Sequence, residues 1–149
     1  MENPSKRSAV KLIHFSDIHV WSVWGWDWDF GLKRLLGRLN LWFIRRRLYP
    51  PAWGRKVVEA IAASDADAVI FSGDVSTASL VKEFDSARDL LAPIMQKWGD
   101  RFIAIPGNHD RYTPRSIRKQ TFERHVLDRE ITYPFVQRLS DDVAVIGLD

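Results

Sequence analysis

The sequence predicts an α/β fold built on a largely parallel sheet. Hydrophobic residues make up 46% of the 149 residues, which is enough to form the core of one domain. Short apolar runs rich in β-branched residues end at turn-forming or polar residues, as buried strands do, and segments with helical periodicity separate these runs. Strands that alternate with helices pair in parallel, because each helix returns the chain to the same edge of the sheet.

The expected elements follow one another in a strand–helix order. A proline inside the second helix, Pro93, predicts a kink or an end there. A charged stretch around His125 has helical character and precedes the last strand. The strands are expected at residues 11–16, 68–72, 101–105 and 143–148, and the main helices at residues 55–64 and 80–97.

The composition narrows the chemistry that the chain can carry. It contains no cysteine, so disulfides and thiolate metal sites are excluded, and any metal is bound through nitrogen and oxygen. The net charge of +3 is modest. The N-terminal segment is polar and basic without the apolar stretch of a signal peptide, and no apolar run is long enough to span a membrane. We therefore expect a cytoplasmic protein.

An unusual insertion, at about residues 20–55, separates the first two predicted strands. It contains six of the seven tryptophans, and residues 33–56 include eight basic residues and no acidic one. Leucines recur there at helical spacing with arginines between them, which predicts a basic amphipathic helix. Our candidates for substrate binding are the consecutive residues Arg45, Arg46 and Arg47.

Polar side chains that can bind metal follow three of the predicted strands. Asp17 and His19 follow the first strand, Asp74 follows the second, and Asn108 and His109 follow the third. The carboxyl ends of parallel strands meet at one edge of the sheet, so we expect these side chains to lie together. Residues i and i+2 of an extended backbone point to the same side, which predicts that Asp17 and His19 reach one cation.

Each of the two shorter motifs has a structural alternative. An aspartate near a histidine also occurs as a turn cap beside a structural histidine, and the glycine before Asp74 is typical of an ordinary turn. The third motif, P-G-N-H-D at residues 106–110, is more specific, because Asn108 offers a carbonyl ligand and the adjacent His109 can donate a proton. Together the three motifs favour a functional site over a purely structural one.

The three motifs resemble those of the calcineurin-like metallophosphoesterases, whose pattern is D-x-H, G-D, G-N-H-D or G-N-H-E, a later histidine and G-H-x-H. The resemblance spans nearly the whole chain. It implies a four-layer αββα sandwich, with residues 1–149 forming the N-terminal part of a single domain, and metal-dependent hydrolysis of phosphoesters. It also implies two divalent metal ions, and mixed nitrogen and oxygen ligands favour manganese, iron or zinc.

The resemblance assigns a role to each ligand. Asp17 and His19 would bind the first metal ion, Asp74 would bridge both ions, and Asn108 would bind the second. This agrees with the needs of phosphoester hydrolysis, in which a metal-activated water attacks in line while the cations neutralise the phosphoryl oxygens.

Two further residues are implied in catalysis. His109 would protonate the leaving group or stabilise charge in the transition state. Asp110 would support the loop and orient His109.

The last two motifs of the family are absent from the 149 residues. The one histidine beyond His109 is His125, which we expect to be a solvated surface side chain. We expect the chain to be part of a longer domain that, alone, binds metal weakly and hydrolyses little. The G-D motif continues without the acid and arginine typical of serine/threonine phosphoprotein phosphatases, which disfavours that subfamily.

The insertion is the main indication of the substrate. Basic residues among leucines, flanked by tryptophans, fit a segment in a lipid headgroup layer, so we expect a phosphorylated small molecule or lipid-linked substrate and peripheral association with an anionic membrane surface. Nucleic acid is a less favoured alternative. A helix that only packs its leucines on the domain is the structural alternative, and a metal- or membrane-binding module without catalysis is the non-enzymatic one.

Overall fold

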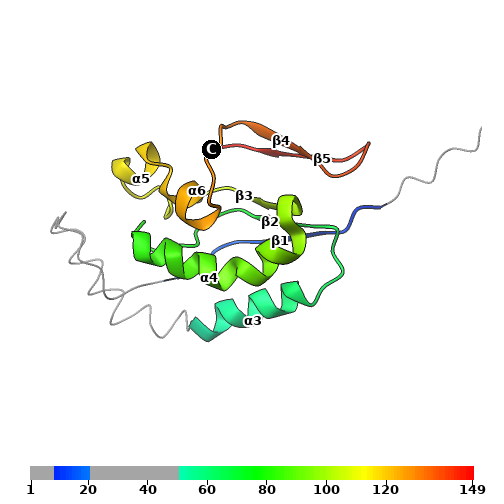
Figure 1. Cartoon of the computed structure of the whole chain (residues 1–149), viewed down its shortest axis with the longest axis horizontal. Helices are drawn as coiled ribbons and strands as arrows, with labels where there is room; N and C mark the ends of the chain where they lie inside the picture. The colour runs from blue at the N-terminus through cyan, green and yellow to red at the C-terminus, as the bar shows by residue number, and fades with distance from the viewer. Residues whose placement is uncertain (1–8, 21–50) are drawn as a thin grey trace, which may run out of the picture.

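The computed structural model describes residues 9–20 and 51–149, and Figure 1 shows how the elements in these ranges are arranged. The predicted amphipathic helix, with Arg45, Arg46 and Arg47, lies outside the described residues. In chain order the elements are β1 (Leu12–Phe15), α3 (Pro51–Ala62), β2 (Ala68–Phe71), α4 (Val81–Trp98), the 3₁₀ turn η2 (Gly99–Arg101), β3 (Phe102–Ala104), α5 (Pro114–Arg118), α6 (Thr121–Val126), β4 (Phe135–Arg138) and β5 (Ala144–Gly147).

A parallel sheet carries the metal-binding motifs. Its strand order is β1-β2-β3, and both pairings are parallel, with Phe71 of β2 opposite Phe15 on one side and Ala104 on the other. The helices α3 and α4 provide the connections between these strands. The predicted α/β class and the three strands before the motifs are therefore confirmed.

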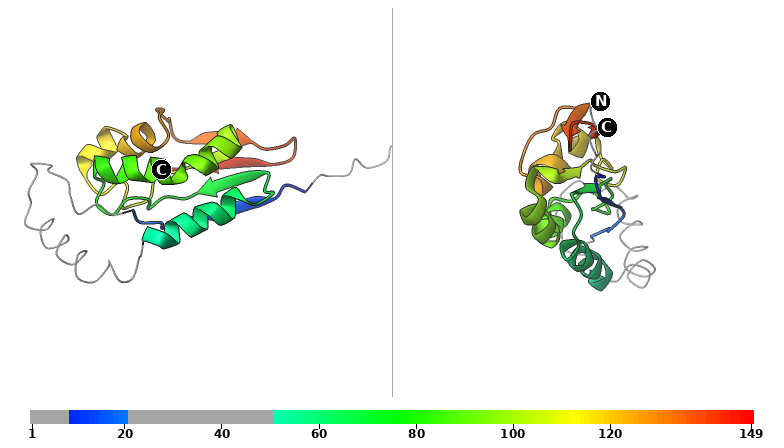
Figure 2. Two further views of the ribbon diagram at one scale, coloured as in Figure 1. Left: turned by 60° about the horizontal axis from the view of Figure 1, so that its bottom comes forward. Right: turned by 90° about the vertical axis from the view of Figure 1, so that its right-hand side faces the viewer.

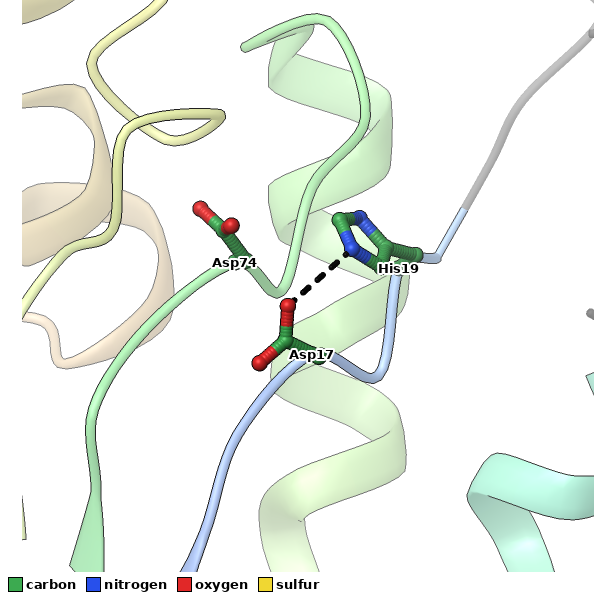
Figure 3. Close-up of side chains that lie close together, drawn as sticks. All are labelled: Asp17, His19 and Asp74. Carbon is green, nitrogen blue, oxygen red and sulfur yellow. Dashed lines mark ion pairs between the residues drawn. The ribbon is translucent and has the colours of Figure 1, made fainter.

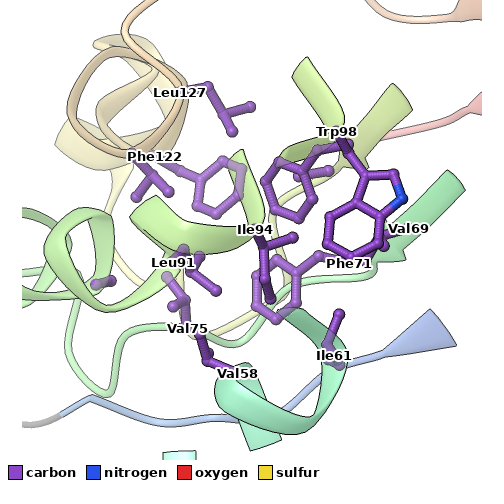
Figure 4. Packing of buried hydrophobic residues seen from close by; sticks show 14 of the residues in the cluster. Val58, Ile61, Val69, Phe71, Val75, Leu91, Ile94, Trp98, Phe122 and Leu127 are labelled. Atoms are coloured by element: carbon purple, nitrogen blue, oxygen red, sulfur yellow. The ribbon is translucent and has the colours of Figure 1, made fainter. Parts of the chain in front are cut away.

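Side chains that alternate along the strands divide the interior into two clusters. On β2, Val69 and Phe71 face the helices and pack in the larger cluster with the apolar faces of α3, α4 and α6. Figure 4 shows Phe71 in this cluster together with Phe122 of α6. Ala68 faces the other way and packs with Leu139 beside the C-terminal hairpin. The sheet is thus covered on both faces, as a parallel sheet requires.

The predicted fourth strand does not join the parallel sheet. It forms β5, which pairs antiparallel with β4 in a separate two-stranded sheet, with Val136 opposite Ile146. A short turn, closed by a hydrogen bond from the Leu139 N–H to the Val143 carbonyl (2.8 Å), joins the two strands and leaves no room for the crossover that a parallel pair needs. In Figure 1 this hairpin lies on the side of the parallel sheet away from α3 and α4, and the right-hand view of Figure 2 shows it opposite α3.

Both main helices differ in detail from the prediction. Helix α3 begins at Pro51, four residues before the predicted start, because proline is well suited to the first helical turn. The end of the insertion therefore belongs to α3. Helix α4 runs from Val81 to Trp98, close to the predicted residues 80–97, and continues through Pro93, so of the two alternatives of a kink or an end at Pro93 the end is wrong. Pro93 lies on the exposed side of α4, where water can solvate the carbonyl group that loses its helical partner. Among the described residues, no helix is both long and apolar enough to cross a membrane.

Candidate metal centre

The loops after β1 and β2 run side by side beyond the ends of their strands. The backbone N–H of Asp17 donates to the Gly73 carbonyl (3.0 Å), and the N–H of His19 donates to the Asp74 carbonyl (3.1 Å). An isolated parallel bridge between Val20 and Ser76 continues this pairing. The D-x-H and G-D motifs are therefore held together by the backbone itself.

The backbone at the three motif residues is left-handed. The φ angles are 60° at Asp17, 48° at His19 and 58° at Asp74, although none of these residues is glycine. The prediction that Asp17 and His19 converge through strand alternation is wrong in its reason, since both lie beyond β1 and are not extended. Non-glycine residues in this region cost free energy and are enriched at functional sites.

These three side chains form a cluster that can hold a metal ion. One ligand atom each from Asp17, His19 and Asp74 lies within 4.8 Å of the others, as Figure 3 shows. Oδ1 of Asp17 lies 3.4 Å from Nε2 of His19, and the Ser16 hydroxyl donates to Oδ2 of Asp17 (2.5 Å). The oxygen–nitrogen donor set fits a divalent transition metal, and the 4.8 Å limit on the spacing is close to the maximum of about 4.4 Å between ligands that bind one ion at about 2.0–2.2 Å.

The loop after β3 joins the cluster through two glycines. A Cβ atom on Gly73, whose φ is +92°, would overlap the backbone of Gly107, and a Cβ atom on Gly107 would overlap Asp74. This close approach lets the N–H of His109 donate to Oδ1 of Asp74 (2.8 Å). Asn108 stands between Gly107 and His109, and its side chain is exposed at this edge.

Asp110 ties the third loop to the second. Its Oδ2 accepts hydrogen bonds from the N–H groups of Asp74 (2.8 Å) and Gly107 (3.0 Å), and its Oδ1 accepts from that of Ser76 (2.8 Å). The carboxyl group is fully buried, and this burial raises the pKa of Asp110 while the backbone donors oppose the shift. Asp110 thus bonds to the backbone of both loops, whereas the Thr77 carbonyl holds the ring of His109.

Backbone carbonyls hold the two histidine rings of the site. Nδ1 of His109 lies 2.9 Å from the Thr77 carbonyl, and Nδ1 of His19 lies 3.3 Å from the Ser76 carbonyl. A carbonyl can only accept, so each Nδ1 carries the hydrogen, and in the neutral ring Nε2 carries the lone pair. The rings meet edge to face with their centroids 5.1 Å apart.

A buried ionic network follows directly after Asp110. Nη2 of Arg111 donates to Oε1 of Glu123 (2.7 Å) and to Oδ2 of Asp149 (2.6 Å), and the Tyr133 hydroxyl also donates to Oε1 of Glu123 (3.0 Å). The Glu123 side chain is 0% exposed. Burial and the neighbouring Glu123 charge raise the pKa of Tyr133 above its usual range. This network fixes the loop after β3 to α6 and to the end of β5.

The other two histidines make separate contacts. His14 is exposed on β1, and its Nε2 lies 2.7 Å from the Ser72 hydroxyl. His125 lies in α6, as its helical context predicted, and its Nδ1 lies 3.0 Å from Asp85 of α4.

Sequence reasoning missed three groups around the site. Ser79 contacts the loop of His109, Glu83 contacts the segment between the G-D motif and α4, and Arg111 anchors the third loop. A glutamate at the third position of a helix is a known capping signal, but the residue at the N-cap is Leu80, which lacks the usual side-chain oxygen and conceals the signal. No sequence pattern indicates the partners of Arg111, because they lie far along the chain.

Comparison with protein families identifies the family to which a chain with this site belongs. The model of the family described as calcineurin-like phosphoesterase matches residues 10–146, which include all three motifs. The chain belongs to the calcineurin-like phosphoesterases. No curated protein sequence matches it. The predicted resemblance is thereby confirmed.

Membership of the calcineurin-like phosphoesterases gives the site its general chemistry. The family hydrolyses phosphoesters with divalent metal ions, and the Asp17–His19–Asp74 cluster supplies suitable ligands in this chain. The chain is a domain of a hydrolase family, has mixed α/β structure, and carries its candidate metal ligands at the carboxyl edge of the parallel sheet.

Proposed function

We propose that the protein hydrolyses a phosphomonoester, phosphodiester or pyrophosphate by attack of a water molecule activated between two divalent metal ions. The observation that carries this proposal is the convergence of Asp17, His19 and Asp74, with His109 bonded to Asp74 through its backbone. This convergence supports the proposal that three loops, distant in sequence, contribute metal ligands and a proton donor to one site.

The roles of the side chains follow from their atoms. Asp17 and His19 would hold the first ion, Asp74 would share its two oxygens between both ions, and Asn108 would offer its amide oxygen to the second. When bound, divalent ions lower the pKa of a water ligand and withdraw charge from phosphoryl oxygens. The donor set suits manganese, iron or zinc.

His109 would supply the proton that the leaving oxygen requires. The Thr77 carbonyl accepts from its Nδ1, so Nε2 is the atom that delivers a proton. Asp110 would act through the loop backbone that it anchors.

Metal binding in the 149-residue polypeptide is proposed to be weak. The four candidate ligands within residues 9–20 and 51–149, Asp17, His19, Asp74 and Asn108, are fewer than two metal ions take up. Slow hydrolysis is therefore the expected result. The non-enzymatic candidate is a module that binds metal without turnover.

Hydrolysis of bis(p-nitrophenyl) phosphate with manganese, zinc or iron tests the proposal. We expect slow, metal-dependent release of p-nitrophenol that is lost in Asp74→Asn and reduced about 10²–10⁴-fold in His109→Ala. Glu59→Gln, an exposed substitution on α3, is the control. Metal binding without any metal-dependent release would favour the binding module over the enzyme, whereas rapid turnover would contradict the expected weak metal binding.

One described surface supports the proposal of a cytoplasmic protein that acts on a lipid-linked substrate at the anionic inner face of the membrane. On α3, the Trp53 side chain is 65% exposed and Val57 is also exposed, while Nζ of Lys56 lies 5.8 Å from the Trp53 ring. These residues recur at helical spacing on one face. A tryptophan beside a cation and an apolar side chain suits the headgroup layer.

Sedimentation with vesicles of anionic phospholipid tests this second proposal. We expect the chain to sediment with the vesicles and expect Trp53→Ala, or alanines at Arg45, Arg46 and Arg47, to reduce sedimentation. The exposed Tyr112→Ala, which removes an aromatic ring elsewhere, is the control. No sedimentation together with salt-sensitive retention of DNA would favour the nucleic acid alternative.

A further inference from the structure

The turn at residues 76–80 touches both histidines of the metal centre. Its first two carbonyls accept from Nδ1 of His19 and His109, at 3.3 and 2.9 Å. Both rings are therefore held as the Nδ1–H form when neutral, with Nε2 carrying the lone pair. A metal ligand needs that lone pair, and a proton donor needs Nε2 for its exchangeable hydrogen. The conformation of this turn thus decides the form of both rings.

Ser79 connects the turn to the loop that carries His109. Its hydroxyl donates to the His109 carbonyl (2.7 Å) and accepts from the N–H of Tyr112 (2.9 Å). The Ser76 hydroxyl donates to the same His109 carbonyl (3.1 Å). Two hydroxyl groups of the turn therefore donate to the His109 carbonyl, and the same turn also holds the His109 ring.

Ser79 occupies a backbone conformation that favours glycine. Its φ is 55°, and the residue is buried. A serine there is strained, and glycine would remove the strain. What serine adds is the hydroxyl, and both of its hydrogen bonds go to the loop of His109.

Glu83 holds the turn from the other side. Its side chain is buried, and its Oε2 accepts from the N–H groups of Ala78 (2.9 Å), Leu80 (3.2 Å) and Thr77 (3.3 Å). Hydrogen bonds to a buried carboxylate are among the stronger ones in proteins. The peptide group whose carbonyl faces His109 follows Thr77, and its N–H is the one on Ala78. Glu83 and His109 therefore hold opposite ends of one peptide unit.

We infer that Ser79 and Glu83 are positioning residues of the metal centre. They fix the conformation of the 76–80 turn, and the carbonyls of this turn hold the rings of His19 and His109 with Nε2 directed into the site. A role of Ser79 and Glu83 in catalysis rests on the proposed function. Their effect on which nitrogen of each imidazole ring carries the hydrogen does not. Neither residue is required to touch the substrate.

Nitrogen NMR of the imidazole side chains in the metal-free protein tests the inference. At about pH 8.5, where an ordinary histidine is neutral, we expect Nδ1–H signals for His19 and His109. Ser79→Gly keeps a permitted backbone and removes the hydroxyl, so it should convert His109 to a mixture of Nδ1–H and Nε2–H forms. Glu83→Gln keeps an oxygen acceptor and should give a smaller change, and Glu83→Ala should affect both rings.

Manganese affinity, measured by calorimetric titration, is the second readout. We expect about 10–100-fold weaker binding in Ser79→Gly and Glu83→Ala, with Glu83→Gln in between. The exposed residues Ser86 of α4 and Glu59 of α3 supply the controls, as Ser86→Gly and Glu59→Gln, which should match the wild type.

The outcomes separate this inference from the proposed function. An unchanged Nδ1–H signal of His109 and an affinity within twofold of wild type in Ser79→Gly would overturn the positioning role. So would Nε2–H signals in the wild-type protein. If no phosphoester is hydrolysed but the imidazole signals change as expected, the proposed reaction fails and the positioning role stands. If Ser79→Gly does not fold, the graded response of Glu83→Gln and Glu83→Ala decides.

Discussion

Replacing Gly107 with alanine should separate the two loops that form the metal centre. A Cβ atom there would lie 2.5 Å from the backbone nitrogen of Asp74, whereas ordinary contact begins near 3.4 Å. The loops must therefore move apart by about 0.9 Å. The hydrogen bond from the His109 N–H to Asp74, now 2.8 Å, would become too long to form.

The size of the effect follows from that lost bond. A hydrogen bond to a carboxylate contributes about 1.5–3 kcal/mol, so we expect the free energy of unfolding in urea to fall by about that amount. Asp74 also loses a group that orients it, so manganese affinity should fall about 10–100-fold.

A second glycine provides a control. Gly99 adopts a positive φ (52°), which Gly107 does not, and a Cβ atom on Gly99 meets nothing within 4 Å. Gly99→Ala should cost about 1–3 kcal/mol of stability through backbone strain alone and leave metal affinity unchanged. Wild-type manganese affinity in Gly107→Ala, or equal affinity losses in both variants, would refute the close-approach argument.

Three further predictions concern the framework around the site. Lys97→Met removes the donor to two carbonyls at the end of α3 and should cost about 1 kcal/mol in urea unfolding, whereas Lys82→Met at the start of α4 should cost nothing. Because burial raises the pKa of Asp110, the native state retains its proton to higher pH than the unfolded chain, so stability should fall as the pH rises above about 3.8. Asp110→Asn should flatten that part of the pH profile, and an unchanged slope would contradict the assignment. Arg111→Met leaves the buried charge of Glu123 without its cation and should cost about 3–5 kcal/mol of thermal or urea stability, part of which the added Glu123→Gln should restore.

The motifs were visible in the sequence because they are local. Short apolar runs that stop at polar residues identified β1, β2 and β3, and the parallel pairing follows from the helices between them. The hairpin was only half predicted. Residues 135–138 contain Gln137 and Arg138 and lack the apolar pattern of a buried strand, so β4 was missed.

The sequence by itself determined the fold class, the family and which side chains have metal-binding chemistry. Only the tertiary structure decided how those side chains meet. The left-handed backbone at Asp17 and Asp74, and the close contact of Gly73 with Gly107, come from packing between loops. The hydrogen bonds of Ser79 to the loop of His109 link residues about thirty positions apart. Such contacts leave no periodic trace, because their free energy depends on where distant segments are brought together, whereas hydrophobic periodicity depends only on neighbouring residues.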